Sequence, residues 1–392
     1  MFKYFQQDED LEWVKQTGHR GWSFQMMRLI AQSHYGGGQF SEAHEAARRI
    51  TYGDDESWLR EWTRMGERLE GMAEEAEREG HFLTARDRYL RACNYYRTGE
   101  FFVPPGDPRK IPTYDRGVAC FQKGGRYFRP ALERILVPYE GTTLPGYFIP
   151  PRNAPPGPAP AVIFFGGSDS TAEELYFLVT GLAERGLGLL IVDGPGQGWA
   201  LRHQGLYTRP DWEVPAGAAY EYLAQRPEVD PKRIAIMALS YGGYLAPRAA
   251  AYEHRFAACV AWGAHYDLYE FWARRPDDHP LAVNWQWILG AKSMAEAREK
   301  MKAFTLRGIV GQIECPTLVV MGEEDGEARL ALGRRMYNEL RSPRTFRLFT
   351  SEETGAAHCQ MDNLALSNEY IGDWLIDVLV HGKIPAGEKP AS

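Results

Sequence analysis

A serine between a predicted strand and a predicted helix is the strongest candidate for chemistry in this sequence. Ser240 occurs in Ala-Leu-Ser-Tyr-Gly-Gly, which has the form GxSxG except that Ala238 replaces the first glycine. A sharp turn of this kind exposes the serine hydroxyl in strained backbone geometry, and small neighbours let the strand and helix approach each other. Gly242, Gly243 and the small Ala238 meet that need. The segment therefore predicts a nucleophilic serine.

A histidine far downstream is the candidate base. A serine hydroxyl is a weak nucleophile until a base takes its proton. His358 lies nine residues beyond Phe349, where the last predicted strand ends, and His381 is the only other histidine downstream of that strand. His381 falls at the end of the final predicted helix, where a capping role is expected. We therefore predict His358 as the base.

An acid that orients this base is expected after the strand before last. Asp325 follows the apolar run 316–321, and its neighbours Glu323 and Glu324 are interpreted as solvated charges. Asp267, which follows the preceding strand, is a second candidate position. The favoured order Ser, Asp, His is the order of α/β hydrolases and differs from that of chymotrypsin-like and subtilisin-like enzymes.

Two backbone N–H groups are needed to stabilise a developing oxyanion. One donor is expected from Tyr241, the residue after the serine. The other is expected from the glycine-containing loop 166–170, where either Gly167 or Ser168 can supply it.

The sequence predicts neither a cofactor nor a metal. The segment Asp-Gly-Pro-Gly-Gln-Gly (193–198) lacks GxGxxG spacing and is interpreted as a structural loop. No HExxH or comparable ligand spacing occurs. The five cysteines are scattered and free of CxxC spacing, which predicts reduced thiols in a cytoplasmic protein.

Short apolar runs alternate with helical segments through the larger part of the chain. This pattern is typical of a mostly parallel sheet with helices on both faces, the α/β-hydrolase fold. A hairpin at 134–149 precedes it. The predicted strands are 161–165, 187–193, 233–239, 256–262, 316–321 and 345–349, and the predicted helices are 172–185, 216–225, 241–252, 328–340 and 364–380.

Two segments depart from this alternation. Residues 1–128 read as helical, with apolar side chains at spacings of three and four, for example Trp58, Trp62 and Met65. They predict an N-terminal helical cap domain before a catalytic domain at 129–392. Residues 268–309 mix aromatic and charged side chains and predict a helical lid insertion.

Composition excludes several kinds of partner. The chain has 392 residues and a net charge of −7, so it has no general electrostatic reason to bind nucleic acid or an anionic membrane. Its N-terminal segment 1–13 contains acidic residues where a signal peptide needs an apolar run, and no apolar stretch is long enough to span a bilayer.

Several stretches together resemble one subgroup of hydrolases. The chain is similar to the group of 2,6-dihydroxypseudooxynicotine hydrolase, to fungal polyketide-shortening hydrolases of pigment biosynthesis, and more distantly to FrsA-like esterases. The helical segment 84–92 looks like the N-terminal domain of that group. The other similar stretches are 165–174, 193–198, 240–244 and 257–263.

The resemblance implies cleavage of a carbon–carbon bond next to a ketone in an aromatic or polyketide-like substrate. It also implies an N-terminal domain that caps the active site, and homodimers, which occur in the group. Such carbon–carbon hydrolases are thought to use a further acid near the substrate, and Glu270 lies in about the right region. An ordinary ester or amide hydrolase with the same triad is the first alternative. A non-hydrolytic cyclase or binding protein on the same fold is the second.

Overall fold

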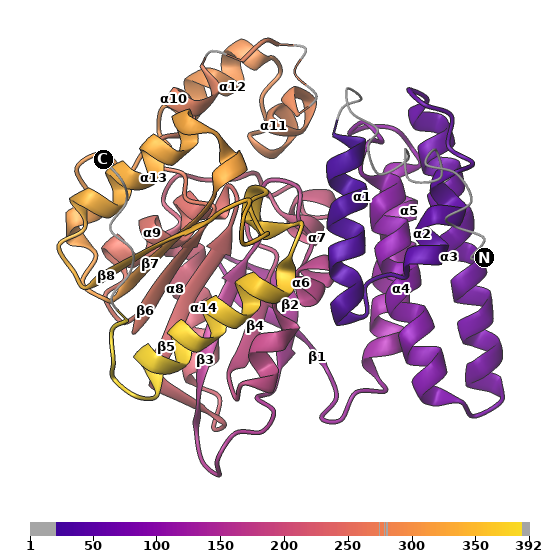
Figure 1. The fold of residues 1–392 in the computed structure, drawn as a ribbon, viewed down its shortest axis with the longest axis horizontal. Helices are drawn as coiled ribbons and strands as arrows, with labels where there is room; N and C mark the ends of the chain where they lie inside the picture. Colours follow the sequence, from indigo (N-terminus) through magenta and orange to yellow (C-terminus); the bar gives the residue numbers. More distant parts are fainter. Residues whose placement is uncertain (1–20, 274, 278, 280, 386–392) are drawn as a thin grey trace. The chain divides into compact units, whose positions relative to one another are not determined.

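The computed structural model describes residues 21–273, 275–277, 279 and 281–385. The chain divides into two compact units, Met1–Ala131 and Leu132–Ser392. In its described part, the first unit is built from helices alone and the second contains the sheet (Figure 1).

The helices of the first unit form because their apolar residues recur on one face. In α3, Trp58, Trp62 and Met65 are buried, and the Asp54 side chain caps the first turn. A Cβ added at Gly66 of α3 would lie 2.9 Å from the Tyr96 ring of α4, so this close helix contact needs glycine. The helices are α1 (Trp22–Ala31), α2 (Phe40–Ala47), α3 (Asp55–Arg78), α4 (Phe82–Glu100) and α5 (Lys110–Gly125), with the short helix η2 (Gln32–Tyr35).

The second unit contains an eight-stranded sheet in the order β1-β2-β4-β3-β5-β6-β7-β8. The β1–β2 and β2–β4 pairs are antiparallel, and every other pair is parallel. The sheet therefore matches the mostly parallel arrangement expected from the sequence. The strands are β1 (Glu133–Tyr139), β2 (Thr142–Ile149), β3 (Ala159–Phe165), β4 (Gly188–Val192), β5 (Val229–Leu239), β6 (Ala258–Trp262), β7 (Thr317–Gly322) and β8 (Arg344–Phe349).

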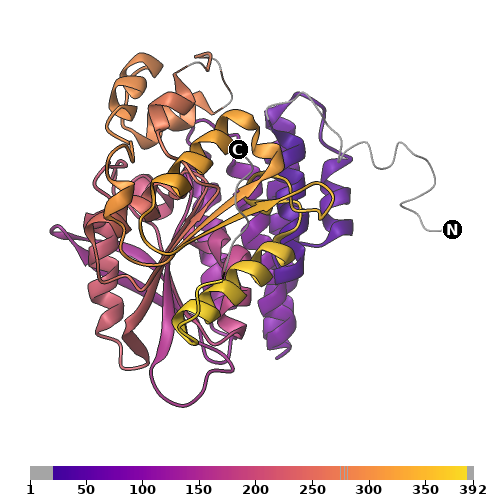
Figure 2. The same cartoon turned by 60° about the vertical axis from the view of Figure 1, so that its left-hand side comes forward.

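Helices pack on both faces of this sheet (Figures 1 and 2). Helix α6 contacts α14, and α8 contacts α9. The sequence missed α7, a five-residue helix that begins at a glycine and is too short for a periodic pattern. The helices are α6 (Ala172–Glu184), α7 (Gly198–Arg202), α8 (Glu213–Ala224), α9 (Gly242–Tyr252), α13 (Glu327–Glu339) and α14 (Leu364–Leu379).

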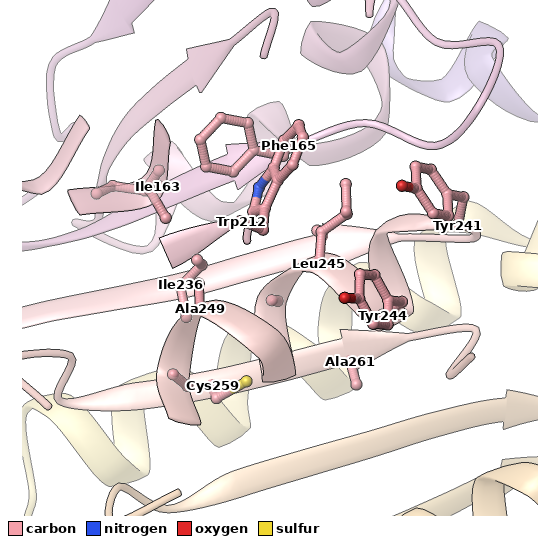
Figure 3. Packing of buried hydrophobic residues seen from close by; sticks show 14 of the residues in the cluster. Ile163, Phe165, Trp212, Ile236, Tyr241, Tyr244, Leu245, Ala249, Cys259 and Ala261 are labelled. Atoms are coloured by element: carbon pink, nitrogen blue, oxygen red, sulfur yellow. The ribbon is translucent and has the colours of Figure 1, made fainter. Parts of the chain in front are cut away.

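Alternate residues of the central strands fill the core under α9. Figure 3 shows Ile163 on β3, Ile236 on β5 and Ala261 on β6 in one buried cluster with Leu245 and Ala249 of α9. Side chains at every second strand position point to the same face, so these strands hold α9 in place through apolar contacts. Helix α9 begins directly after Ser240 and Tyr241, so this packing fixes the turn that carries the serine.

An insertion between β6 and β7 contains α10 (Leu268–Trp272), α11 (Ala282–Ile288) and α12 (Met294–Met301), followed by η3 (Val310–Gln312). Trp285 of α11 packs edge-on against Tyr241, with ring centroids 5.1 Å apart. Trp285 also contacts Trp272 at 5.3 Å. The helical insertion predicted at 268–309 is therefore joined by aromatic contacts to the start of α9. Among the described residues, no helix is long and apolar enough to cross a membrane.

Candidate active site

Ser240 occupies a strained turn between β5 and α9. Its φ of 59° lies in the left-handed region, which is uncommon for a residue other than glycine. Its backbone N–H donates a 2.7 Å hydrogen bond to the Trp262 carbonyl at the end of β6. The turn geometry predicted from GxSxG is therefore present at this serine.

The alanine at the first position of the motif fits because a later glycine makes room for it. A Cβ added at Gly242 would lie only 2.6 Å from the Ala238 Cβ and 2.9 Å from the Gly166 carbonyl oxygen. A Cβ at Gly243 would lie 2.6 Å from the Gly263 carbonyl oxygen. The tight approach of strand and helix therefore depends on Gly242 and Gly243 and accommodates the Ala238 methyl group.

The structure brings the predicted serine, histidine and acid together. His358 Nε2 lies 2.8 Å from Ser240 Oγ, and His358 Nδ1 lies 2.6 Å from Asp325 Oδ1. Asp325 ends η4 (Glu323–Asp325), its side chain has no exposed surface, and its Oδ2 accepts a 3.1 Å hydrogen bond from the Gly322 N–H. His358 begins η5 (His358–Gln360), after β8. The arrangement allows the imidazole to take a proton from the serine while the carboxylate holds the ring.

An arginine that sequence reasoning missed lies against this cluster. Arg329 Nη1 donates to Asp325 Oδ1 at 2.7 Å and lies 2.6 Å from His358 Nδ1. Its Nη2 lies 3.4 Å from His265 Nε2. Arg329 lies in the first turn of α13, four residues after Asp325, and this spacing in the sequence was the available signal.

Burial and the Arg329 charge set the protonation of these groups. Burial alone would raise the pKa of Asp325, but His358 and Arg329 outweigh it and hold that pKa well below its usual range. Burial, aided by Arg329, lowers the pKa of His358 and lowers that of His265 further. Both imidazoles are therefore neutral near pH 7, which is the form that a base requires.

His265 was also missed by sequence reasoning. Its Nδ1 lies 3.1 Å from the Gly263 carbonyl oxygen, so Nδ1 carries the proton and Nε2 accepts from Arg329. A Cβ at Gly263 would lie 3.0 Å from His358 Cε1 and 2.7 Å from Cys359 Sγ. The residues after β6 therefore pack directly against the histidine of the candidate site.

The loop after β3 approaches the serine as expected. A Cβ added at Gly167 would lie 3.0 Å from the Ser240 Cβ. The Gly167 N–H already donates a 3.1 Å hydrogen bond to Ser170 Oγ, and the Ser168 carbonyl accepts from the Asn284 side chain at 2.9 Å. The Tyr241 side chain is turned to Thr208, with the two hydroxyls 2.9 Å apart, so Tyr241 offers the site only its backbone.

Comparison with known proteins identifies the family. Residues 173–370 match the family model described as prolyl oligopeptidase family. The chain belongs to this family of α/β hydrolases. The predicted α/β-hydrolase fold is confirmed, and the chain is an enzyme of the hydrolase class.

Relatives within the family lie in the subgroup that the sequence resembles. The chain is 33% identical to 20-hydroxy-prefusarin hydrolase FUS2 of Gibberella moniliformis, over 76% of this chain and 80% of that protein. It is 31% identical to hydrolase ORFZ of Pyricularia oryzae, over 88% and 93% of the two chains. The solved structure of 2,6-dihydroxy-pseudo-oxynicotine hydrolase has a TM-score of 0.79 and 27% identity, over 92% of this chain and 98% of that one. The resemblance to fungal hydrolases and to the pseudooxynicotine enzyme is therefore confirmed.

In this hydrolase, the segment 193–198 supports the loop that faces the serine. The Gln197 side chain donates to the Gly166 carbonyl at 2.7 Å. The buried Asp193 carboxylate accepts from the N–H groups of Ala172 and Trp199 at 2.9 and 2.8 Å. Burial and the neighbouring Glu173 raise the pKa of Asp193 to about 8. These contacts agree with the structural role predicted for the segment.

The structure does not bring Asp267 or Glu270 to the histidine. Asp267 caps α10 by accepting the Glu270 N–H at 2.7 Å, and its Oδ2 accepts from Arg307 Nε at 2.9 Å. Glu270 forms an ion pair with Arg307 and leaves 46% of its side chain exposed. Among the described residues, neither carboxylate contacts Ser240 or His358, and no three His, Cys, Asp or Glu side chains form a group that could hold a metal ion.

Proposed function

We propose that this hydrolase works through a serine nucleophile and cleaves a carbon–carbon bond next to a ketone. The observation that supports the nucleophile is the 2.8 Å contact between His358 Nε2 and Ser240 Oγ, with Asp325 on the far side of the ring. In the proposed reaction His358 takes the Ser240 proton as the oxygen attacks the ketone carbonyl. Asp325 holds the ring and stabilises the imidazolium that forms.

The backbone N–H groups of Tyr241 and Ser168 are proposed to stabilise the oxyanion. Tyr241 directly follows the nucleophile, and the loop that contains Ser168 lies against Ser240. Gly167 and Ser168 were both candidates for the second donor. The hydrogen bond from the Gly167 N–H to Ser170 occupies one of them, which favours Ser168.

In a β-diketone the carbon–carbon bond beside the attacked carbonyl then breaks, and its electron pair leaves with the departing carbon as an enolate that the second carbonyl stabilises. His358, now an imidazolium, returns a proton to that carbon. A water molecule deprotonated by His358 attacks the acyl group on Ser240 and releases the carboxylic acid. Glu270 is still only predicted to act as a further acid. In the structure it forms an ion pair with Arg307.

The substrate class is proposed from the relatives and the aromatic insertion. One relative is named as a hydrolase of 20-hydroxy-prefusarin, and the neighbouring solved structure is a 2,6-dihydroxy-pseudo-oxynicotine hydrolase. In the insertion, Trp285 packs against Tyr241, and Trp272 packs against Trp285. Large apolar side chains of this kind suit a flat aromatic or polyketide-like substrate. The cap role of the N-terminal helices, a homodimer and a cytoplasmic location stay predictions.

Reaction with a fluorophosphonate tests the nucleophile, and two substrates test the bond. Wild-type protein should be labelled at Ser240, and the Ser240→Ala variant should not. Turnover of a β-diketone that exceeds turnover of p-nitrophenyl esters supports carbon–carbon cleavage. Rapid ester turnover with an intact β-diketone instead supports a carboxylesterase. A Glu270→Gln variant that loses β-diketone cleavage but keeps ester hydrolysis would assign Glu270 as the acid.

A further inference from the structure

Two arginines share one phenylalanine ring beside the candidate nucleophile. The Arg329 guanidinium carbon lies 4.4 Å from the Phe271 ring centroid, and the Arg275 guanidinium carbon lies 4.1 Å from the same centroid. Arg275 also lies 4.7 Å from the Trp272 ring. His265 meets the same Phe271 ring edge-on at 5.1 Å. Two positive charges therefore converge on one aromatic side chain of the insertion.

The charges of this cluster do not balance. Arg329 is matched by the Asp325 carboxylate at 2.7 Å. Arg275 is partly buried. Among the described residues, which leave out 274, 278 and 280, no carboxylate pairs with its guanidinium. Burial and the nearby Arg329 charge lower the pKa of Arg275, as two close cations require. A partly buried cation without a counter-charge is costly, so its retention here points to an anion that binds beside it.

One member of the cluster, Arg329, lies next to the histidine of the candidate active site. His358 Nε2 lies 3.2 Å from Arg329 Nη1 and 2.8 Å from Ser240 Oγ. A carbonyl carbon under attack by Ser240 is therefore a few bonds from the Arg329 guanidinium, and Arg275 lies on the same Phe271 ring as Arg329. Arginine forms planar, paired hydrogen bonds that match a carboxylate in geometry.

We propose that Arg275, just after α10, and Arg329 of α13, which both lie over the Phe271 ring, form a subsite for a carboxylate close to the scissile ketone, so that the substrate is a keto acid. Arg329 is already held by Asp325, and Arg275 supplies the uncompensated charge. The inference rests on the proposed function, because it takes Ser240 as the point of attack.

Binding to the Ser240→Ala variant tests the subsite without turnover. The probes are benzoylpyruvate, a β-diketone that carries a carboxylate, and its ethyl ester, which lacks that charge. We expect calorimetry to show that the acid binds about tenfold or more tightly than the ester, since charge-assisted hydrogen bonds are stronger than neutral ones. The preference should shrink as salt is added.

Three second-site variants in the Ser240→Ala background assign the preference. Arg275→Met should weaken binding of the acid about tenfold and leave the ester unchanged, while Arg275→Lys should retain part of the preference. Lys302→Met is the matched control, because it removes a charge from the same insertion at a residue paired with Glu299 and stacked on Tyr269. It should change neither affinity.

Equal affinity for acid and ester in the Ser240→Ala protein would overturn the subsite. An equal loss of affinity for both probes in Arg275→Met would also overturn it. If that variant fails to fold, Arg275→Gln replaces it, and loss of the preference for the acid in Arg275→Gln supports the subsite, whereas an unchanged preference overturns it. Fluorophosphonate labelling of the otherwise unmodified protein separates the two hypotheses. Labelling at Ser240 without acid preference refutes the subsite alone, whereas absence of labelling refutes the proposed function.

Discussion

Two neighbouring strands of this hydrolase are each followed by an aspartate that pairs with an arginine, yet the two aspartates differ in what they can do. Asp325 follows β7 and accepts from Arg329 at 2.7 Å, and Asp267 follows β6 and accepts from Arg307 at 2.9 Å. Only Asp325 also contacts a histidine, His358, at 2.6 Å. An acid and an arginine at a strand end are therefore a common structural pair, and the histidine makes one of the two a candidate for catalysis.

Electrostatics alone does not separate the two aspartates. In both, burial raises the pKa. The charges and hydrogen bonds of His358 and Arg329 outweigh it at Asp325, and the Glu270 N–H and Arg307 outweigh it at Asp267, so both carboxylates stay ionised. The Asp267 oxygens accept hydrogen bonds from Thr305, from Arg307 and from the Glu270 N–H of the helix that Asp267 caps. The partners of each carboxylate, rather than its charge, therefore distinguish the structural aspartate from the candidate catalytic one.

Removal of the serine should have the largest effect, because Asp325 can matter for catalysis only if Ser240 is the nucleophile. Ser240→Ala should lower kcat by on the order of 10⁵-fold. The measurement is turnover of whichever substrate the wild-type protein cleaves, with circular dichroism to show that the variant is folded. A variant that keeps most of its rate would leave Asp325 without a catalytic partner.

Replacement of Asp325 should have the next largest effect. Asp325→Asn keeps the shape of the side chain but favours the wrong tautomer of His358, so kcat should fall by roughly 10³- to 10⁴-fold. Steady-state kinetics at the pH optimum measures the loss. If the loss stays within tenfold, another acid orients the histidine, and Asp267 becomes the first residue to replace.

Arg329 should affect the pH dependence more than the maximal rate. His358 must be neutral to take a proton, so activity rises with pH through its pKa, which burial and Arg329 hold below the ordinary 6.5. Arg329→Gln removes a positive charge, so the acidic limb of the kcat/KM profile should move to higher pH. Arg329→Lys keeps the charge and should leave the limb near its wild-type position. A uniform loss at every pH would instead indicate a purely structural role.

The positions of the three candidate catalytic residues could be predicted from the sequence, because the ends of the strands follow from the pattern of apolar residues. Apolar runs and the GxSxG-like turn located the ends of β5 and β7, and residues at the carboxyl ends of parallel strands must gather at one edge of a sheet. The proximity of Ser240, Asp325 and His358 could therefore be predicted from three distant segments. Their catalytic roles stay predictions.

The remaining contacts depend on side-chain directions that pattern does not encode. Arg329 follows Asp325 by four residues, but a spacing in the sequence does not show that the guanidinium also reaches a histidine. His265 contacts Arg329 directly, and both of them meet Arg275 around the Phe271 ring. These contacts arise from how the insertion packs, which the local sequence leaves open.

The smallest effect on activity is expected at Asp267. Asp267→Asn keeps one oxygen for the cap of α10 but turns an amide toward Arg307 and Thr305, which are both donors. The free energy of unfolding should fall by about 1 kcal/mol, since a cap is weakened and the ion pair with the partly exposed Arg307 adds little. Turnover should stay within about twofold of wild type, because the side chain contacts none of the reacting groups. Urea denaturation and kcat/KM measured on one preparation check both effects. A loss of turnover as large as that of Asp325→Asn would reverse the assignment of the two aspartates.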